Sequence, residues 1–285
     1  MMKNLEKPIL INGSPRSGTT YLYRYLKKWN PYALFEPVSA LVCEKSLPDG
    51  VNKHSIILSS PAYSLRKLGE VAELNVFWPR IMVLDFLEKI KGIPFKEITL
   101  HLYLDEPLIT KEWEPYHIVR DPVSVYLSLK EVLLSPRMIW KLTGWIAELR
   151  DNDVPLLKNL VSSLAKLQVY MMSVNEIAGK LMQLTKCKYE VRYQDLFEAF
   201  MVYWILANYH AVRKVDEERL LVYEEPKTFL KLPNFEEYAK ENPPKPVKRK
   251  NEKLSKRIPE IIKKYELEPE WEYLQRTIEK VKSTV

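Results

Sequence analysis

The fold is decided by the stretch Pro8 to Lys28, whose centre reads Gly13-Ser14-Pro15-Arg16-Ser17-Gly18-Thr19-Thr20. A short apolar run, Pro8 to Asn12, precedes the first glycine, and the residues from Gly18 onward have the composition of a helix. This order predicts a strand, a glycine-bounded loop and a helix. Backbone amides and the positive end of the helix can converge on a phosphate in such a loop.

The loop differs from a nucleotide-triphosphate loop at one decisive position. That loop has Lys after its last glycine and then Ser or Thr, so that the Lys holds the terminal phosphates and the hydroxyl a magnesium ion. Here Thr19 follows Gly18, and the cation lies earlier in the loop, as Arg16. A planar guanidinium suits a tetrahedral oxyanion held at two points. Two of the seven glycines of the chain fall in this loop, which makes an accidental turn a weaker explanation.

Further strand signals alternate with helical ones along the chain. The candidate strands are Tyr32 to Phe35, Ile98 to Leu104, Tyr116 to Val119 and Leu220 to Tyr223. After the third of these, Asp121 can cap a helix that begins at Pro122 and runs to about Leu134. A long helix is expected around Phe197 to Arg213. This alternation predicts an α/β fold in which helices flank a parallel sheet, similar to P-loop NTPases.

The length of 285 residues and the 46% of hydrophobic side chains favour a single domain, 1–285. Two stretches, at about 38–95 and 135–200, are poor in strand signals, and we expect them to be helical insertions that shape an acceptor pocket. A basic segment, 245–285, completes the chain. Oligomeric state is not readable from the sequence.

The sequence features that bear on location favour a cytoplasmic protein. Cys43 and Cys187 stand far apart without a CxxC partner, which argues against a disulfide scaffold and a zinc ribbon. The amino terminus lacks the long apolar run of a signal peptide. The longest apolar stretch, Phe200 to Val212, is shorter than the roughly 20 residues of a bilayer span, so we interpret it as a core helix.

Positive charge is concentrated between Lys245 and Arg257. Seven basic residues and one acid, Glu252, give this segment a net charge of +6, against +7 for the whole chain. The segment could be a solvated linker, a nonspecific nucleic-acid patch, or a lid over an anionic ligand. No zinc-finger, RNA-stacking or paired-helix motif accompanies it, so nucleic-acid binding rests on charge alone.

Two motifs resemble those of the sulfotransferases that use 3′-phosphoadenosine 5′-phosphosulfate (PAPS). The sequence PRSGTT, Pro15 to Thr20, looks like the family's 5′-phosphosulfate loop, and HIVRDPVSVYLSL, His117 to Leu129, looks like its 3′-phosphate element. The segment Leu34 to Pro37 is similar to the Glu-containing strand of carbohydrate and tyrosyl-protein members. More loosely, the helix around Trp204 and the strand ending at Tyr223-Glu224 also match.

The resemblance implies sulfuryl transfer from PAPS to a hydroxyl or amine of a small-molecule, sugar or peptide acceptor, with adenosine 3′,5′-bisphosphate as product. The implied ligands of the 5′ side are Arg16, Ser17, Gly18, Thr19 and Thr20. Those of the 3′-phosphate are Arg120 and Ser128, and the run Lys248-Arg249-Lys250 resembles the basic loop that closes over the cofactor. No metal is expected, because no carboxylate or His cluster at ligand spacing accompanies the loop.

Sulfuryl transfer needs a base for the acceptor proton and a cation near the bridging oxygen. Arg16 can supply the cation. For the base, the resemblance offers Glu36, as in carbohydrate and tyrosyl-protein members, or His101, as in cytosolic small-molecule members. Those cytosolic members carry a Lys two residues before their His, where this chain has Thr99, and Lys111 is a speculative substitute. We prefer Glu36 and keep His101 second.

The sequence is also compatible with other functions. A nucleotide kinase or NTPase would share the first strand, loop and helix, and a noncatalytic protein could bind nucleic acid through 245–257. A degenerate family member could bind the cofactor without transferring a sulfuryl group. The acceptor is not identified, although aromatic side chains in the presumed pocket segments could stack on a sugar or a ring. These are Trp78, Trp113, Trp140 and Trp145.

Overall fold

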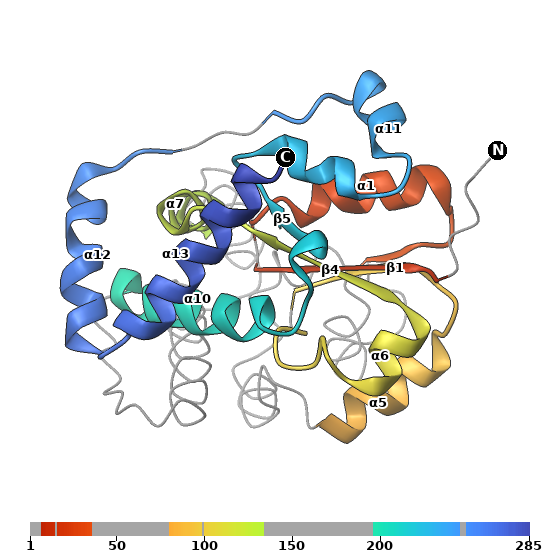
Figure 1. The fold of residues 1–285 in the computed structure, drawn as a ribbon, viewed down its shortest axis with the longest axis horizontal. Helices are drawn as coiled ribbons and strands as arrows, with labels where there is room; N and C mark the ends of the chain where they lie inside the picture. The colour runs from red at the N-terminus through yellow and green to blue at the C-terminus, as the bar shows by residue number, and fades with distance from the viewer. Residues whose placement is uncertain (1–6, 15, 36–79, 99, 134–195, 246–248) are drawn as a thin grey trace, which may run out of the picture.

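A five-stranded, all-parallel sheet forms the centre of the molecule, in the strand order β2-β3-β1-β4-β5. The computed structural model describes residues 7–14, 16–35, 80–98, 100–133, 196–245 and 249–285 (Figure 1). The strands are β1 (Ile9–Gly13), β2 (Leu34–Phe35), β3 (Phe95–Glu97), β4 (Glu114–Val119) and β5 (Leu220–Val222). Because all strands run in one direction, their carboxyl ends meet at a single edge, where ligands bind in open α/β sheets.

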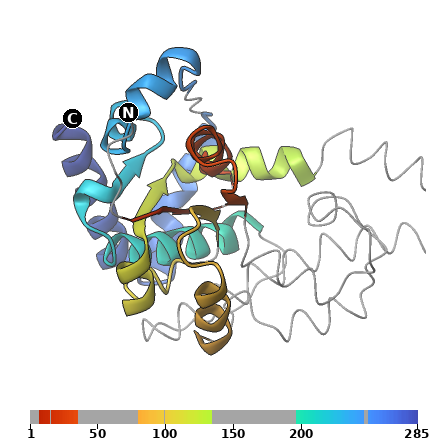
Figure 2. The ribbon, with the colours of Figure 1, turned by 90° about the vertical axis from the view of Figure 1, so that its right-hand side faces the viewer.

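Helices cover both faces of this sheet, as Figures 1 and 2 show. The α-helices are α1 (Thr19–Trp29), α5 (Arg80–Lys89), α6 (Pro107–Glu112), α7 (Pro122–Leu133), α10 (Leu196–Val212), α11 (Phe235–Glu241), α12 (Glu252–Lys264) and α13 (Glu268–Ser283). Two short 3-10 helices, η1 (Glu217–Arg219) and η2 (Pro226–Lys231), flank β5. The predicted α/β class is therefore confirmed.

Successive side chains of β1 point to opposite faces of the sheet, and the residues buried with them show which helices cover each face. Ile9 and Ile11 are buried with residues of α1, η2 and α11. Leu10, pointing the other way, is buried with residues of α5 and α6, and β5 packs on the same face against α10 and α13. Asn12 follows Leu10 by two residues and so points toward that second face, a placement that matters below.

The long apolar helix α10 is a core helix, as its composition predicts. Its residues from Phe200 to Ala207 are all buried, and it packs against α13, α12 and α7. Among the described residues, none of the helices is both long and apolar enough to cross a membrane.

The predicted strand Ile98 to Leu104 is wrong. The strand β3 ends at Glu97, and a turn follows, in which the Tyr103 amide donates to the Leu100 carbonyl. Leu100 and Leu104 are both fully buried, a spacing of four residues that suits a turn and not the alternation of a strand. The Leu100 amide donates to the Asn12 side chain, which takes the place of a strand partner.

The other predicted elements near the loop agree closely with the structure. The strand, loop and helix at the amino end correspond to β1 and α1, and the run Tyr116 to Val119 lies within β4. The Asp121 carboxylate accepts from the Ser124 amide, so it caps α7 as expected. Most of the expected insertions, 38–95 and 135–200, lie outside the described residues. The described part of the first contains the helix α5 and ends at the first residue of β3.

We predict that Phe235→Ala lowers the free energy of unfolding by about 3–5 kcal/mol, because it empties a packed aromatic site. Phe235 is 1% exposed, and its ring lies 5.5 Å from the rings of Tyr25 and Phe229. The matched control is Leu230→Ala in η2, whose side chain is 56% exposed and which should cost less than about 0.5 kcal/mol. Equal losses in urea denaturation of the two variants would contradict this packing.

Candidate anion-binding site

The loop between β1 and α1 bends through two left-handed residues. Arg16 has φ 68° and Gly18 has φ 100°, and the Ser17 amide donates to the Ser14 carbonyl at 3.1 Å. The helix begins at Thr19, and the first amides of a helix have no acceptor within it. The loop therefore presents backbone N–H groups at the positive end of α1, an arrangement that attracts anions.

Arg120 joins this loop to the end of β4. Its Nη1 donates to the Arg16 carbonyl oxygen at 2.8 Å, and its guanidinium lies 4.2 Å from the centre of the Tyr223 ring. The side chain is 7% exposed. The two arginines that the sequence places about a hundred residues apart are thus in direct contact.

Two more of the expected residues lie beside these arginines. The Arg16 Nε donates to the Ser128 Oγ at 3.1 Å, so the loop also contacts the middle of α7. The Arg249 amide donates to the Ser124 Oγ at 2.9 Å, which fixes the basic segment against the first turn of α7. Arg16, Arg120 and Ser128 are therefore linked to one another at the carboxyl edge of the sheet, and the backbone of Arg249 lies at the start of the same helix, α7.

The electrostatics of this region favour a bound anion. Burial lowers the pKa of Arg120, and the positive charges of Arg249 and Arg16 act in the same direction, while Tyr223 and Glu224 oppose them. The Glu224 carboxylate lies 4.0 Å from the Arg120 Nε and also accepts from the Asp121 amide. Burial raises the pKa of Glu224, so its own charge is also disfavoured. A dianion such as phosphate would relieve the repulsion among the three arginines.

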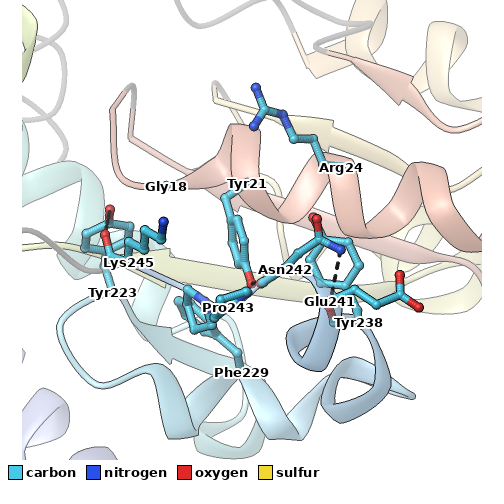
Figure 3. A pocket seen from close by; sticks show the side chains of 11 residues that line it. Gly18, Tyr21, Arg24, Tyr223, Phe229, Tyr238, Glu241, Asn242, Pro243 and Lys245 are labelled. Carbon is cyan, nitrogen blue, oxygen red and sulfur yellow. Dashed lines mark hydrogen bonds between the residues drawn. The ribbon is translucent and has the colours of Figure 1, made fainter.

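A pocket of about 430 Å³ opens next to the loop (Figure 3). Gly18, just before α1, and Tyr21 of α1 line one side, together with Tyr223, which directly follows β5. The rest of the wall comes from Arg24, Phe229, Tyr238 and the segment from Glu241 to Lys245. The Tyr21 hydroxyl donates to the Asn242 carbonyl, and the Tyr223 hydroxyl to the Lys245 carbonyl. Two aromatic side chains beside an anion-binding loop fit a ligand that joins a flat ring to a phosphate.

Gly18 is required where the loop meets the pocket. A Cβ at this position would lie 2.5 Å from the Tyr223 ring, in addition to the strain of φ 100°. Gly13 is equally confined, because its Cβ would lie 2.5 Å from the Ile118 side chain and 2.8 Å from the Ser17 Oγ. Both glycines allow the loop backbone to approach β4 and β5.

The remaining loop residues differ in exposure. Ser17 and Thr19 are buried, whereas Thr20 is exposed. The Ser17 Oγ has no hydrogen-bond partner among the described residues, so a buried hydroxyl is available to a ligand at the base of the loop. Lys250 is exposed.

Of the two candidate bases, the structure describes only His101. His101 is 1% exposed, and its ring centre lies 5.3 Å from that of His117. Burial lowers the pKa of His101 well below its usual value, and His117 and His210 add to this effect. A neutral imidazole has the right protonation for a base, but no surface is open to an acceptor. Glu36 lies outside the described residues, as does Lys248.

Lys111, the speculative substitute for the leaving-group Lys, lies away from the anion loop. It lies on α6, just before β4 begins, and its side chain is 79% exposed. The start of β4 pairs with Ile9 at the beginning of β1, so Lys111 lies at the edge of the sheet opposite the loop. Of the expected stacking tryptophans, Trp113 is fully buried in the core, and the other three lie outside the described residues.

Sequence reasoning missed the residues that support this site. Tyr21, Ser124 and the segment before Lys245 reach it from three distant parts of the chain. Asn12 and His117 are a different case, because each is a polar residue near the end of an apolar strand run. Such a residue facing a buried helix needs a hydrogen-bond partner, and that signal could have found them.

Searches of protein-family models and of curated protein sequences find no match to this chain. Within the described ranges, no three His, Cys, Asp or Glu side chains are placed to hold a metal ion.

We predict that Gly18→Ala strongly weakens anion binding, because the new methyl group displaces the Tyr223 ring or the loop. Gly92→Ala is the matched control: Gly92 has φ 76° but nothing within 4 Å of its Cβ position. Backbone strain alone should cost each variant about 1–2 kcal/mol of unfolding free energy, and Gly18→Ala should lose more. Equal stability and equal affinity for adenosine 3′,5′-bisphosphate in the two variants would contradict the close approach.

Proposed function

We propose that this protein is a PAPS-dependent sulfotransferase. One observation carries the proposal: Arg16 of the anion loop, Arg120 just after β4 and Ser128 of α7 are linked beside a helix amino end, close enough to Arg249 for its charge to act on Arg120. The Lys of a triphosphate loop is missing from this loop. Three arginines around a region of partly buried charge match a ligand that carries anionic groups at two points. Adenosine 3′,5′-bisphosphate has two phosphates on one nucleoside.

The residues at the site fit such a nucleotide. The loop amides and Arg16 would hold the 5′ side, and Arg120, Ser128 and Arg249 the 3′-phosphate. The pocket between Tyr21 and Tyr223 borders the loop at Gly18 and would take the adenine ring. Arg16 and Arg120 are in contact, so a single small molecule could reach both.

In the proposed reaction, an acceptor hydroxyl attacks the sulfur, the bond from sulfur to the bridging phosphate oxygen breaks, and adenosine 3′,5′-bisphosphate leaves. A general base takes the hydroxyl proton. Arg16 would face the negative charge that develops on the leaving phosphate, and the loop amides would bind the same group. The proposed reaction needs no metal, because Arg16 and the loop amides would stabilise the departing charge.

The base is proposed to be Glu36. His101 is neutral, but its burial against His117 keeps it from an acceptor in this arrangement. This favours Glu36, which directly follows β2 in the sequence.

Calorimetric titration tests the proposed ligand class. Adenosine 3′,5′-bisphosphate should bind in the presence of a metal chelator, and ATP with magnesium should bind more weakly. Tight binding of ATP with magnesium and none of the bisphosphate would favour the kinase or NTPase reading. Salt-sensitive duplex binding that needs 245–257 would favour the nucleic-acid reading.

We predict that Arg120→Ala weakens bisphosphate binding by about 1.5–3 kcal/mol, the value of a charge-assisted hydrogen bond. The matched control is Arg219→Ala, since Arg219 pairs with Glu114 at the opposite edge of the sheet and should leave the affinity unchanged. Arg120→Lys keeps the charge and should fall between the two, because it loses the two-point contact. Wild-type affinity in Arg120→Ala, measured by calorimetry, would remove Arg120 from the site.

We predict that Glu36→Gln abolishes turnover of labelled PAPS while the affinity for bisphosphate stays within a few-fold of wild type. The amide keeps the size of the side chain but cannot accept the proton. His101→Ala should lower turnover less. Full turnover in Glu36→Gln, with activity lost in His101→Ala, would reverse the assignment of the base.

A further inference from the structure

Beneath the anion loop, three fully buried side chains form a hydrogen-bonded chain across the sheet. The Asn12 Nδ2 of β1 lies 3.0 Å from the His117 Nδ1 of β4, and the His117 Nε2 lies 3.0 Å from the Asn208 Oδ1 of α10. Each of the three is 0% exposed. None of them belongs to the ligand-binding residues described above.

Backbone groups at both ends determine which atoms donate. The Leu100 amide can only donate, and it does so to the Asn12 Oδ1 at 3.2 Å. The Asn12 Nδ2 must therefore be the donor toward the His117 Nδ1. At the other end the Trp204 carbonyl can only accept, and the Asn208 Nδ2 donates to it at 2.7 Å. The Asn208 Oδ1 then accepts from the His117 Nε2.

These hydrogen-bond directions allow only one protonation state of the His117 ring. Its Nδ1 accepts and its Nε2 donates, so the ring is neutral with the proton on Nε2. A second proton on Nδ1 would face the N–H of Asn12 and break the chain. Burial likewise lowers the pKa of His117 to about 4.

The chain connects the parts of the site that must keep their spacing. Asn12 directly precedes Gly13, and His117 lies three residues before Arg120 on the neighbouring strand. The Asn208 Nδ2 also points to the Ser14 Oγ at 3.5 Å, inside the anion loop. The Leu100 end adjoins His101.

We propose that His117, as the neutral Nε2–H imidazole, is a positioning residue that holds the anion loop in place relative to Arg120. This rests on the proposed function, in which Arg16 and Arg120 share one nucleotide. His117 acts through Asn12 and Asn208 and touches no ligand. Its removal or protonation should therefore loosen the loop and lower nucleotide affinity.

The titratable groups near His117 lie on β3, on the turn that follows β3 and on α10. His101 follows β3, Glu97 of β3 pairs in register with Asn12, and Tyr203 of α10 bonds to Ser14. His210 of α10 acts on His101. Since the folded state takes up the His117 proton only near pH 4, and the unfolded state near pH 6.5, the free energy of unfolding should fall as the pH drops between these values.

The substitution Asn12→Asp tests the proposal. A carboxylate can only accept, so it reverses the first link and makes His117 hold a proton on Nδ1. In nitrogen-15 NMR spectra, wild-type His117 should stay the neutral Nε2–H form from pH 8 to pH 5, and the variant should carry the imidazolium at pH 7. The variant His117→Phe, whose ring fills most of the same space but makes neither hydrogen bond, should bind adenosine 3′,5′-bisphosphate at least tenfold more weakly at pH 7, and its Ser17 amide should exchange hydrogen at least tenfold faster.

His210→Asn is the matched control, because His210 lies on α10 two residues beyond Asn208 and its Nε2 has no hydrogen-bond partner among the described residues. It should leave both the affinity and the Ser17 exchange within twofold of wild type. If wild type binds the bisphosphate and His117→Phe binds it equally, the positioning role fails while the proposed function stands.

If wild type binds no bisphosphate, the proposed function fails. The hydrogen exchange of the Ser17 amide in His117→Phe then still decides whether the hydrogen-bonded side chains hold the loop. A wild-type His117 that carries its proton on Nδ1, or is charged at pH 6, would overturn the proposal even if the variant did not fold.

Discussion

The hydrogen bond from Arg120 to the Arg16 carbonyl is the contact on which the site depends. It links the loop after β1 to the end of β4, and it holds a buried guanidinium against the Tyr223 ring. A buried arginine is costly unless its donors are used and its charge is compensated. Here Glu224 lies at 4.0 Å, while Arg16 and Arg249 add further positive charge. An anionic ligand would balance the positive charge that these three arginines bring together.

Two layers support this contact. At the carboxyl edge of the sheet, Ser124 anchors Arg249, and Ser128 receives the Arg16 side chain. Below the edge, the amide and imidazole chain through His117 sets the spacing of β1, β4 and α10. The polar groups of the lower layer are paired among themselves, whereas the upper layer brings three positive charges together.

Local sequence patterns predicted much of the fold. They did not predict the contacts between residues that are distant in the sequence. The elements β1, α1, β4 and α7 follow from apolar runs bounded by Gly18, Asp121 and Pro122, which act on their immediate neighbours. The strand predicted from Ile98 failed because burial at Leu100 and Leu104 reflects a turn closed by the Asn12 side chain. The motifs identified Arg16, Arg120 and Ser128, which lie together, but no pattern in the sequence indicates that Tyr21 and Tyr223 border one pocket.

A crystal structure of the protein with adenosine 3′,5′-bisphosphate is the most direct test of the central claim. The account predicts the adenine ring in the pocket between Tyr21 and Tyr223, one phosphate on the loop amides near Arg16, and the other on Arg120 and Ser128. A nucleotide bound away from the loop, or a phosphate that touches neither arginine, would contradict it.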